Sequence, residues 1–147
     1  MRAVVTRVSS ASVEIDEKIV GEIGGGFLVL LGVSPFDTDD SCDKLADKIC
    51  NLRVFSDEDG KMNRSLDQVN GSLLIISQFT LFADTKSRRP GFTGAGKPDI
   101  AIPLYERFLA HCKGRGFDVQ CGEFGADMKV ASVNDGPVTI LFDTEQS

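Results

Sequence analysis

The chain has 147 residues, of which 41% are hydrophobic and 26% charged, and its formal net charge at pH 7 is -6. This size and composition favour one compact domain, residues 1–147, with a single core. The acidic balance excludes a protein whose whole surface grips nucleic acid, because phosphate binding needs concentrated lysine and arginine.

The sequence has neither a membrane span nor a secretion signal by pattern. Its longest apolar run, residues 27–33, is far shorter than the roughly 20 residues that cross a bilayer. Arg2 is followed by alternating residues instead of the unbroken apolar region of a signal peptide. We therefore expect a cytoplasmic protein that does not bind membranes.

Four widely spaced cysteines and a single histidine limit the chemistry further. Cys42, Cys50, Cys112 and Cys121 contain no C-x-x-C pair, and only His111 is available to complete a metal site. This pattern favours reduced, buried thiols over a zinc site or a disulfide. We expect no metal and no cofactor.

The first half of the chain changes from strand to helix spacing. We predict strands over residues 3–8, 12–15 and 18–23, and a longer buried strand from Phe27. Asp16 and Glu17 supply a hairpin turn. From Asp37 the apolar spacing is helical, which predicts a helix that ends near Leu52. A short strand over residues 53–55, a turn over 57–60 and a buried strand over 72–77 follow.

The second half begins with a glycine-rich, basic loop over residues 84–98. A second helix starts at Pro98 or at Pro103 and stops at residues 114–116. Strands are predicted over 117–121, 128–133 and 138–142, the last two joined by an Asn-Asp-Gly-Pro turn. The strand runs are too uneven for regular βαβ alternation. The expected class is α+β, with a mostly antiparallel, barrel-like sheet and two main helices.

The clearest break in core patterning follows the strand over residues 72–77. Ser77, Gln78 and Thr80 place polar side chains where a core strand keeps apolar ones. Two interpretations are open: a hydrogen-bonded strand end, or a site where Thr80 is a nucleophile or residues 77–80 supply oxyanion donors. A nucleophilic hydroxyl needs a base, and the single His111 lies beside the apolar stripe of the second helix. We therefore do not expect a Ser/His/Asp triad.

The loop over residues 84–98 concentrates cations in an otherwise acidic chain. Its four cations are accompanied by one nearby acid, which favours a phosphate-bearing ligand over a merely solvated loop. The cations are Lys86, Arg88, Arg89 and Lys97.

The same loop contains an incomplete nucleotide-binding pattern. Residues 91–97 satisfy the first seven positions of the P-loop G-x-x-x-x-G-K, which makes an NTPase the alternative enzyme class. The pattern fails at Pro98, which offers neither a hydroxyl to magnesium nor an amide to phosphate.

Several motifs, taken in their order and spacing, resemble the D-aminoacyl-tRNA deacylase family over essentially the whole chain. They are residues 1–8 (MRAVVTRV), 77–81 (SQFTL) and 134–139 (NDGPVT), with further matches at 60–63, 82–85, 89–90, 103–108 and 122–126. The chain departs from the family pattern at Gly91, Gly94 and Gly96, where members often read Arg-Pro-Ser-Phe-Thr-Asp-Ala-Ala. It also has Asp127-Met128 where a Met-Met pair is common.

The resemblance implies a homodimer with two active sites at the interface and aminoacyl-tRNA as the partner. Each site is implied to combine Ser77, Gln78, Phe79 and Thr80 of one subunit with a cis Gly136–Pro137 peptide of the other. The carbonyl oxygens of this dipeptide bind the substrate's amino group and leave no room for an L side chain. Two further roles are implied: Arg7 holds the dipeptide, and the backbone of Phe124 orients the substrate.

The implied reaction is hydrolysis of D-aminoacyl-tRNA, and of glycyl-tRNA, whose achiral amino acid passes the same filter. We expect backbone amides near Phe79 and Thr80 to stabilise the oxyanion while the ribose hydroxyl assists water. Thr80 as nucleophile is the alternative mechanism. The four loop cations are expected to bind the acceptor end of tRNA. A dimeric nucleic-acid-binding module without catalysis is the non-enzyme alternative, and the intact residues 77–80 and 136–137 argue against it.

Overall fold

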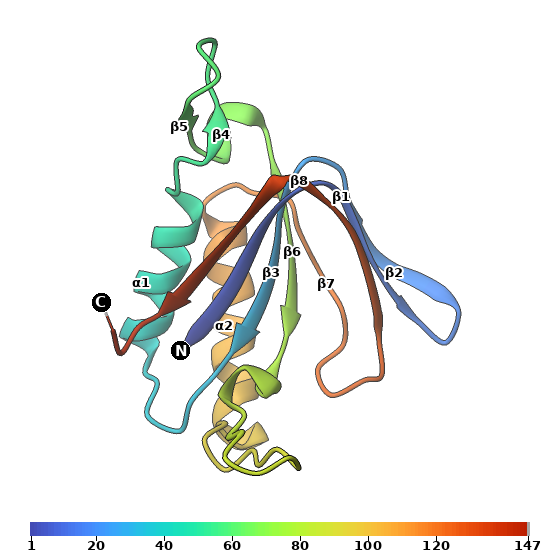
Figure 1. Ribbon diagram of the computed structural model, residues 1–147, viewed down its shortest axis with the longest axis vertical. Helices are drawn as coiled ribbons and strands as arrows, with labels where there is room; N and C mark the ends of the chain where they lie inside the picture. Colours follow the sequence, from blue (N-terminus) through green and yellow to red (C-terminus); the bar gives the residue numbers. More distant parts are fainter. Residues whose placement is uncertain (147) are drawn as a thin grey trace.

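A computed structural model describes residues 1–146 and shows a strongly curved sheet with two helices on one face (Figure 1). The helices are α1 (Asp39–Cys50) and α2 (Pro98–Gly114), and there are two short 3-10 turns, η1 (Asp67–Val69) and η2 (Phe79–Phe82). The α+β class with two main helices is confirmed. The strands are β1 (Arg2–Ile15), β2 (Lys18–Ile23), β3 (Gly26–Gly32), β4 (Phe55–Ser56), β5 (Met62–Arg64), β6 (Ser72–Ser77), β7 (Val119–Cys121) and β8 (Lys129–Asp143).

The main sheet is mixed, which corrects the expectation of a mostly antiparallel one. Its order is β2-β1-β3-β6-β7, with β8 paired to β1. β1 is antiparallel to β2, β3 and β8, whereas β3–β6 and β6–β7 are parallel pairs. The connections explain the difference, because α1 lies between β3 and β6, and α2 between β6 and β7. A helical crossover returns the chain to the same end of the sheet and makes the next strand parallel.

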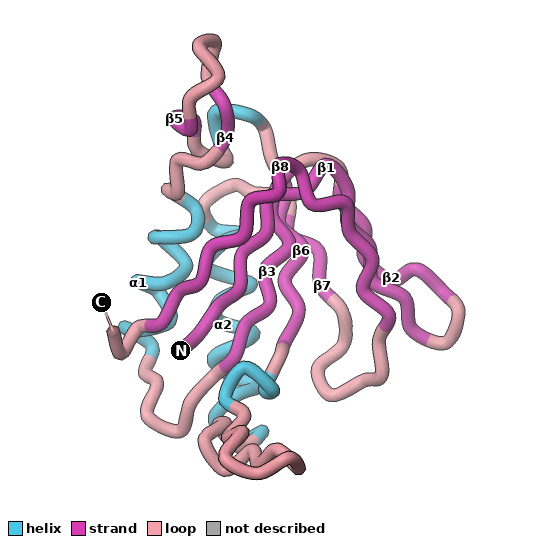
Figure 2. Tube along the Cα trace, viewed as in Figure 1, coloured by secondary structure: helices cyan, strands magenta, loops and turns pink. Residues whose placement is uncertain are grey.

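Two long, bent strands replace four shorter ones that the sequence predicted. β1 is continuous across residues 9–11, and β8 is continuous across the predicted Asn-Asp-Gly-Pro turn (Figure 2). The turn prediction is therefore wrong, and the physical reason is a bulge. The register jumps from Asn134 opposite Val8 to Thr139 opposite Thr6, so the four residues 135–138 lie opposite the single Arg7 and β8 has three extra residues here. Bending of both strands together curls the sheet into an incomplete barrel.

The side chain of Asn134 explains how β8 continues through this bulge. Its Oδ1 accepts a hydrogen bond from the Val138 amide at 2.9 Å, and its Nδ2 donates to Thr139 Oγ1 at 3.1 Å. These bonds span the bulge and return the chain to strand pairing. Turn-forming residues at this point thus deflect a strand instead of reversing it.

The helix boundaries lie close to those predicted. Thr38 caps α1 in a capping box, in which Thr38 Oγ1 accepts from the Ser41 amide and Ser41 Oγ accepts from the Thr38 amide. Of the two predicted starts of α2, Pro98 is correct, and Pro103 lies inside the helix. The strand predicted over residues 53–55 is displaced, because β4 pairs with β5, a strand that the sequence did not predict. No helix within residues 1–146 is long and apolar enough to cross a membrane.

The two faces of the sheet bury separate apolar clusters. Alternate residues such as Val5, Val29 and Ile75 pack with α1 and α2, and a smaller cluster that includes Val13 and Leu74 lies inside the curve. Ile140 and Phe142 of β8 pack against the helix-side cluster, so Leu141 points to the opposite face. Leu141 is 76% exposed, which leaves an uncovered apolar side chain on the face that the helices do not cover.

Candidate active site

The polar break predicted from the sequence lies where β6 ends and η2 begins. The Gln78 amide donates to Leu31 O at 2.8 Å, which ties the end of β6 to β3, and the chain then turns into η2. The first amides of a helix have no intrahelical acceptor. Those of Phe79 and Thr80 are therefore oriented donors at the start of this turn, and Phe79 is 52% exposed.

The Thr80 hydroxyl is held by a side chain and not by a base. Gln78 Nε2 donates to Thr80 Oγ1 at 2.6 Å. An amide nitrogen cannot accept a proton from the hydroxyl, so this contact does not activate Thr80 as a nucleophile. The observed geometry suits a site in which main-chain amides and positioning do most of the work.

Phe124 lies beyond the carboxyl end of β7, whereas η2 lies beyond the carboxyl end of β6. Because β6 and β7 are parallel, Phe124 and η2 lie at the same edge of the sheet, where the carboxyl ends of these strands meet. Tyr105 of α2 connects the two regions: its hydroxyl donates to Ile75 O at 2.7 Å, and its ring lies 6.0 Å from the Phe124 ring. Burial raises the pKa of Tyr105, so this hydroxyl stays a donor. Tyr105 is the single tyrosine of the chain, but nothing in the local sequence distinguishes it from the apolar residues of the second helix.

The basic loop over residues 84–98 packs beside η2. Phe92 makes an edge-on contact with Phe79, with ring centroids 5.0 Å apart, and Asp84 and Gly91 bridge the loop at its base. The Gly96 amide donates to Val33 O at 2.8 Å. A Cβ at Gly96 would lie 3.1 Å from Ser34 O, so this departure from the family pattern has a steric reason. The structure therefore brings residues 77–80, Phe124 and this loop to one edge of the sheet.

The Gly136–Pro137 dipeptide and Arg7 lie at the opposite edge. The Gly136–Pro137 peptide bond is cis, and Gly136 has φ +143°. Arg7 Nε donates to Asp135 O at 2.8 Å and Arg7 Nη1 to Val54 O at 2.6 Å. A Cβ at Gly136 would lie 2.7 Å from Val138 Cγ2 and 3.0 Å from Arg7 Nη2, which accounts for glycine at this position.

The chain by itself does not bring the two predicted halves of the site together. Ser77 pairs with Leu31, which pairs with Ala3, whereas the bulge that contains Gly136 lies opposite Arg7. Four residues along β1 and the three strand spacings from β8 to β6 separate the halves by roughly 20 Å along the sheet. Figure 1 shows the bend of β8 at the upper end and η2 at the lower end.

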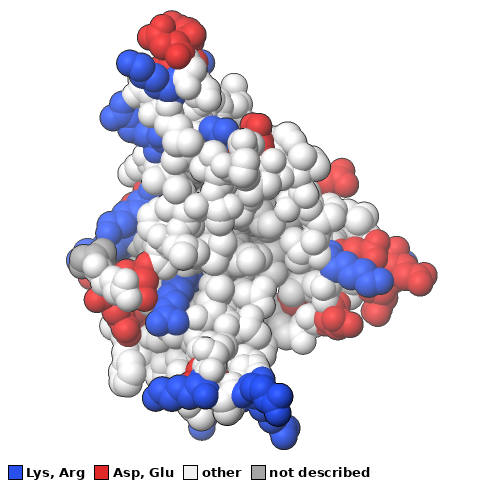
Figure 3. Space-filling model, viewed as in Figure 1, with Lys and Arg blue, Asp and Glu red and all other residues white. Residues whose placement is uncertain are grey.

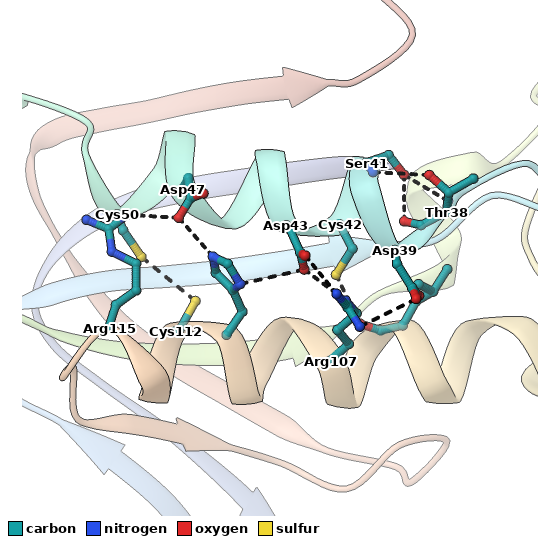
Figure 4. A network of polar contacts seen from close by, with 12 residues as sticks. Thr38, Asp39, Ser41, Cys42, Asp43, Asp47, Cys50, Arg107, Cys112 and Arg115 are labelled. Atoms are coloured by element: carbon teal, nitrogen blue, oxygen red, sulfur yellow. Dashed lines mark hydrogen bonds and ion pairs between the residues drawn. The ribbon is translucent and has the colours of Figure 1, made fainter.

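His111 lies in a separate network between α1 and α2. Figure 4 shows the aspartates Asp43 and Asp47 of this network on α1, with Arg107 and Arg115 opposite them. His111 Nε2 lies 2.8 Å from Asp47 Oδ1 and its Nδ1 3.6 Å from Asp43 Oδ1. Arg107 and Arg115 pair with the same two carboxylates. Hydrogen bonds from His111 and Arg115 hold the pKa of Asp47 below its ordinary value. The single histidine thus joins two helices and is not part of η2.

The charge distribution separates two surfaces. In Figure 3, Lys and Arg side chains gather at the lower end, where Figure 1 places the loop over residues 84–98. The broad area between the upper and lower ends, where the long strands lie, carries few charged groups in this view. The basic end suits a phosphate-bearing ligand, and the uncharged area suits protein contact.

The backbone amides that begin η2 lie beside a Thr80 hydroxyl held by Gln78, an arrangement that suits a small α+β hydrolase in which main-chain donors stabilise an oxyanion. A family model described as D-Tyr-tRNA(Tyr) deacylase matches residues 4–143, and the chain belongs to this family. The chain is similar to a D-aminoacyl-tRNA deacylase of Herpetosiphon aurantiacus, with 54% identity over 147 residues, 99% of this chain and 96% of the relative. A Shewanella baltica protein of the same name is 56% identical over 140 residues, 95% of this chain and 97% of the relative.

A solved structure supports the same fold. The structure titled "c-Myc DNA Unwinding Element Binding Protein" superposes with a TM-score of 0.91 at 39% identity, and the match covers 97% of this chain and 98% of that one. The family membership expected from the motifs is thereby confirmed, as is the barrel-like architecture with two helices.

Proposed function

We propose that the chain hydrolyses D-aminoacyl-tRNA to free tRNA and a D-amino acid, and acts on glycyl-tRNA in the same way. The observation that carries the proposal is the family match over residues 4–143, combined with the main-chain amides at the start of η2. Aminoacyl-tRNA is used in the cytoplasm, so the enzyme acts there.

The reaction proceeds by attack of water on the ester carbonyl carbon. The carbonyl oxygen becomes an oxyanion that accepts hydrogen bonds from the amides of Phe79 and Thr80. The neighbouring ribose hydroxyl assists the water, the bond between the carbonyl carbon and the ribose oxygen breaks, and the departing ribose oxygen takes a proton. The bound state of the Thr80 hydroxyl supports this route over a covalent one.

The active enzyme is a homodimer in which Gly136–Pro137 of one subunit completes the site of the other. Within one subunit this dipeptide lies roughly 20 Å from η2, which supports a site completed by the dipeptide of the other subunit. The exposed Leu141 and Val133 on β8 supply apolar surface for the contact. Carbonyl oxygens of the inserted dipeptide bind the substrate's amino group, and its main chain occupies the space that an L side chain requires.

The tRNA approaches the edge that carries the basic loop. Lys86, Arg88, Arg89 and Lys97 contact phosphates of the acceptor end, and the Phe79–Phe92 contact keeps the loop beside the amides. Phe124 orients the substrate through its backbone, from the adjacent strand end.

The test is a deacylation assay with D-tyrosyl-tRNA, L-tyrosyl-tRNA and glycyl-tRNA. We expect hydrolysis of the D-form and of glycyl-tRNA, and an intact L-form. Binding of D-tyrosyl-tRNA without hydrolysis would favour a non-catalytic RNA-binding module and overturn the proposal. A magnesium-dependent ATP hydrolysis in place of deacylation would instead favour the P-loop alternative.

A further inference from the structure

Arg2, a residue without an assigned role, makes three contacts, two of them with η2. Arg2 Nη1 donates to Leu81 O at 2.8 Å, and the guanidinium carbon lies 4.5 Å from the centroid of the Phe82 ring. Arg2 Nε donates to Asp143 Oδ2 at 3.1 Å. The guanidinium thus joins the beginning of β1, the end of β8 and the last two residues of η2.

The turn that Arg2 contacts is weakly held by its own hydrogen bonds. The bonds at its two ends run from the Leu81 amide to Gln78 O at 3.3 Å and from the Ala83 amide to Thr80 O at 3.1 Å. A single 3-10 turn with bonds of this length gains little stability by itself. External contacts therefore fix its orientation.

The surface beneath η2 is shaped for close contact with it. Gly32, which pairs with Arg2 across β1 and β3, has no side chain to separate the sheet from the turn. A Cβ at Gly32 would lie 3.0 Å from Gln78 O and 3.1 Å from Leu81 Cβ. η2 therefore packs directly against the main chain of Gly32. Arg2 contacts the last two residues of η2, Leu81 and Phe82.

We propose that Arg2 is a positioning residue for the hydrolytic reaction, and this rests on the proposed function. Its guanidinium holds the carbonyl end of η2, and through the turn it fixes the direction in which the Phe79 and Thr80 amides point. Asp143 orients the planar guanidinium so that Leu81 O and the Phe82 ring are contacted together. Arg2 contacts neither the substrate nor the reacting atoms.

Substitutions at Arg2 separate positioning from simple packing. Arg2→Met keeps a long apolar stem on Phe82 but removes every donor, and we expect the turnover rate for D-tyrosyl-tRNA to fall about tenfold, because small misplacements of catalytic groups are costly. Arg2→Lys keeps a positive charge that can reach Leu81 O but lacks the planar guanidinium with its several donors. Its turnover rate should therefore lie between those of Arg2→Met and wild type. Asp143→Asn should give an intermediate loss. KM should change by less than about twofold in all three variants, since ground-state binding is not removed.

Arg107→Met is the matched control. Arg107 also forms a bidentate ion pair, with Asp43, but it joins α1 to α2 at a distance from η2. The Arg107→Met substitution should lower the melting temperature at least as much as Arg2→Met does, while leaving the turnover rate for D-tyrosyl-tRNA unchanged. Equal turnover in Arg2→Met and wild type would overturn the proposal, and so would a loss that merely follows the melting temperature across the variants.

Amide hydrogen exchange tests the same proposal without any substrate. In Arg2→Met, the Leu81 and Ala83 amides should exchange faster than in wild type, while amides of α1 keep their protection; Arg107→Met should show the reverse. If wild type fails to deacylate D-tyrosyl-tRNA, the proposed function fails, and the exchange pattern still decides whether Arg2 holds η2. Unchanged exchange at Leu81 and Ala83 would refute the role of Arg2.

Discussion

Arg7 Nε donates to the carbonyl oxygen of Asp135 at 2.8 Å, directly before the Gly136–Pro137 dipeptide. Arg7 Nη1 donates to Val54 O at 2.6 Å, so a single guanidinium connects the bulge of β8 to the beginning of the β4–β5 hairpin. The Arg7 side chain is only 11% exposed, whereas Asp135 is 62% exposed. A mostly buried cation with two carbonyl acceptors therefore holds an exposed dipeptide in a fixed direction.

Arg7→Met should reduce kcat/KM for D-tyrosyl-tRNA about tenfold, because the dipeptide loses its support and the substrate's amino group is less well oriented. Steady-state deacylation measures the change. Arg64→Met is the control, since Arg64 forms an exposed ion pair with Glu58 in the same hairpin and should leave the rate unchanged. Equal rates for Arg7→Met and wild type would show that the bulge holds its shape without the arginine.

The sequence predicted the elements more reliably than their connections. The helix over Asp39–Cys50 and the strand over Ser72–Ser77 follow from local periodicity, and both are present. The Asn-Asp-Gly-Pro segment has local turn chemistry, but pairing with β1 and the Asn134 side chain keep it in one strand. The register between distant strands depends on the whole sheet and is not encoded in a short window.

The same distinction applies to the site. Ser77 and Thr80 were visible as polar residues in an apolar run, and the loop cations as a local charge excess. Arg2 and Tyr105 had no such signal, because their contacts with Leu81 O and Ile75 O are visible only after folding. Every residue type has a main-chain carbonyl oxygen. The identity of the accepting residue therefore does not reveal a long-range hydrogen bond of this kind.

The chemistry should depend on the main chain of η2 more than on the Thr80 hydroxyl. Thr80→Ala should retain most of the hydrolysis of D-tyrosyl-tRNA, because the hydroxyl is bound by Gln78 Nε2 and lacks a base. Single-turnover kinetics with enzyme in excess measure the chemical step directly. Complete loss of hydrolysis, with folding and tRNA binding retained, would favour a threonine nucleophile.

A proline tests the contribution of an amide in the same turn. Phe79→Pro removes the Phe79 N–H at the first position of η2, where a helix tolerates proline. We expect a loss of about 100-fold or more, as for removal of an oxyanion donor. Phe79→Ala removes the ring and keeps the amide, so its loss should be much smaller. Similar losses in the two variants would argue against a role for the amide.

The basic loop should set the salt dependence of tRNA binding. Replacing all four cations, Lys86, Arg88, Arg89 and Lys97, with glutamine should weaken binding and reduce the slope of log K against log salt by about 0.7–0.9 for each phosphate that the protein no longer neutralises. Filter binding between low and moderate salt gives the slope. The control replaces Lys18, Lys48, Lys61 and Lys113, which changes net charge equally at other surfaces. Equal slopes for the loop variant and wild type would refute the assignment of this loop.

The α1–α2 network should make stability depend on acidic pH. A hydrogen bond from His111 lowers the pKa of Asp47 in the folded state, so its stabilisation is present above the ordinary pKa of about 3.9 and is lost as pH falls through the folded value. Because Asp47 is 48% exposed, screening limits the effect. Asp47→Asn should lower the melting temperature by about 2 °C at pH 7, and the difference should shrink as the pH falls below about 3.9 and vanish below the folded pKa.

Glu106→Gln removes the same charge from an exposed position on α2 and serves as the control for Asp47→Asn. Calorimetry at several pH values should show no comparable pH-dependent difference for it. If the difference between Asp47→Asn and wild type persisted unchanged into acid, the network would act through packing and not through the ionised carboxylate.

Mixed dimers give the sharpest test of a site shared between subunits. Each site is proposed to use η2 of one subunit and Gly136–Pro137 of the other, so Phe79→Pro and Gly136→Ala inactivate opposite halves. Gly136→Ala introduces a Cβ 2.7 Å from Val138 Cγ2 at a φ of +143°. A heterodimer of the two variants, isolated with two affinity tags, contains one site with both defects and one site with none. It should therefore have about half of the wild-type activity, whereas each homodimer is inactive.

The reciprocal heterodimer pairs wild type with a chain that carries both substitutions. Its two sites each contain one defective half, so it should be inactive if the sites are shared. Sites built within single subunits require the opposite result: activity in this second heterodimer and none in the first. Sedimentation velocity on the same samples checks the assembly, and a monomeric wild type that deacylates D-tyrosyl-tRNA at full rate would exclude a shared site, since residues 77–80 and 136–137 lie at opposite edges of one subunit's sheet.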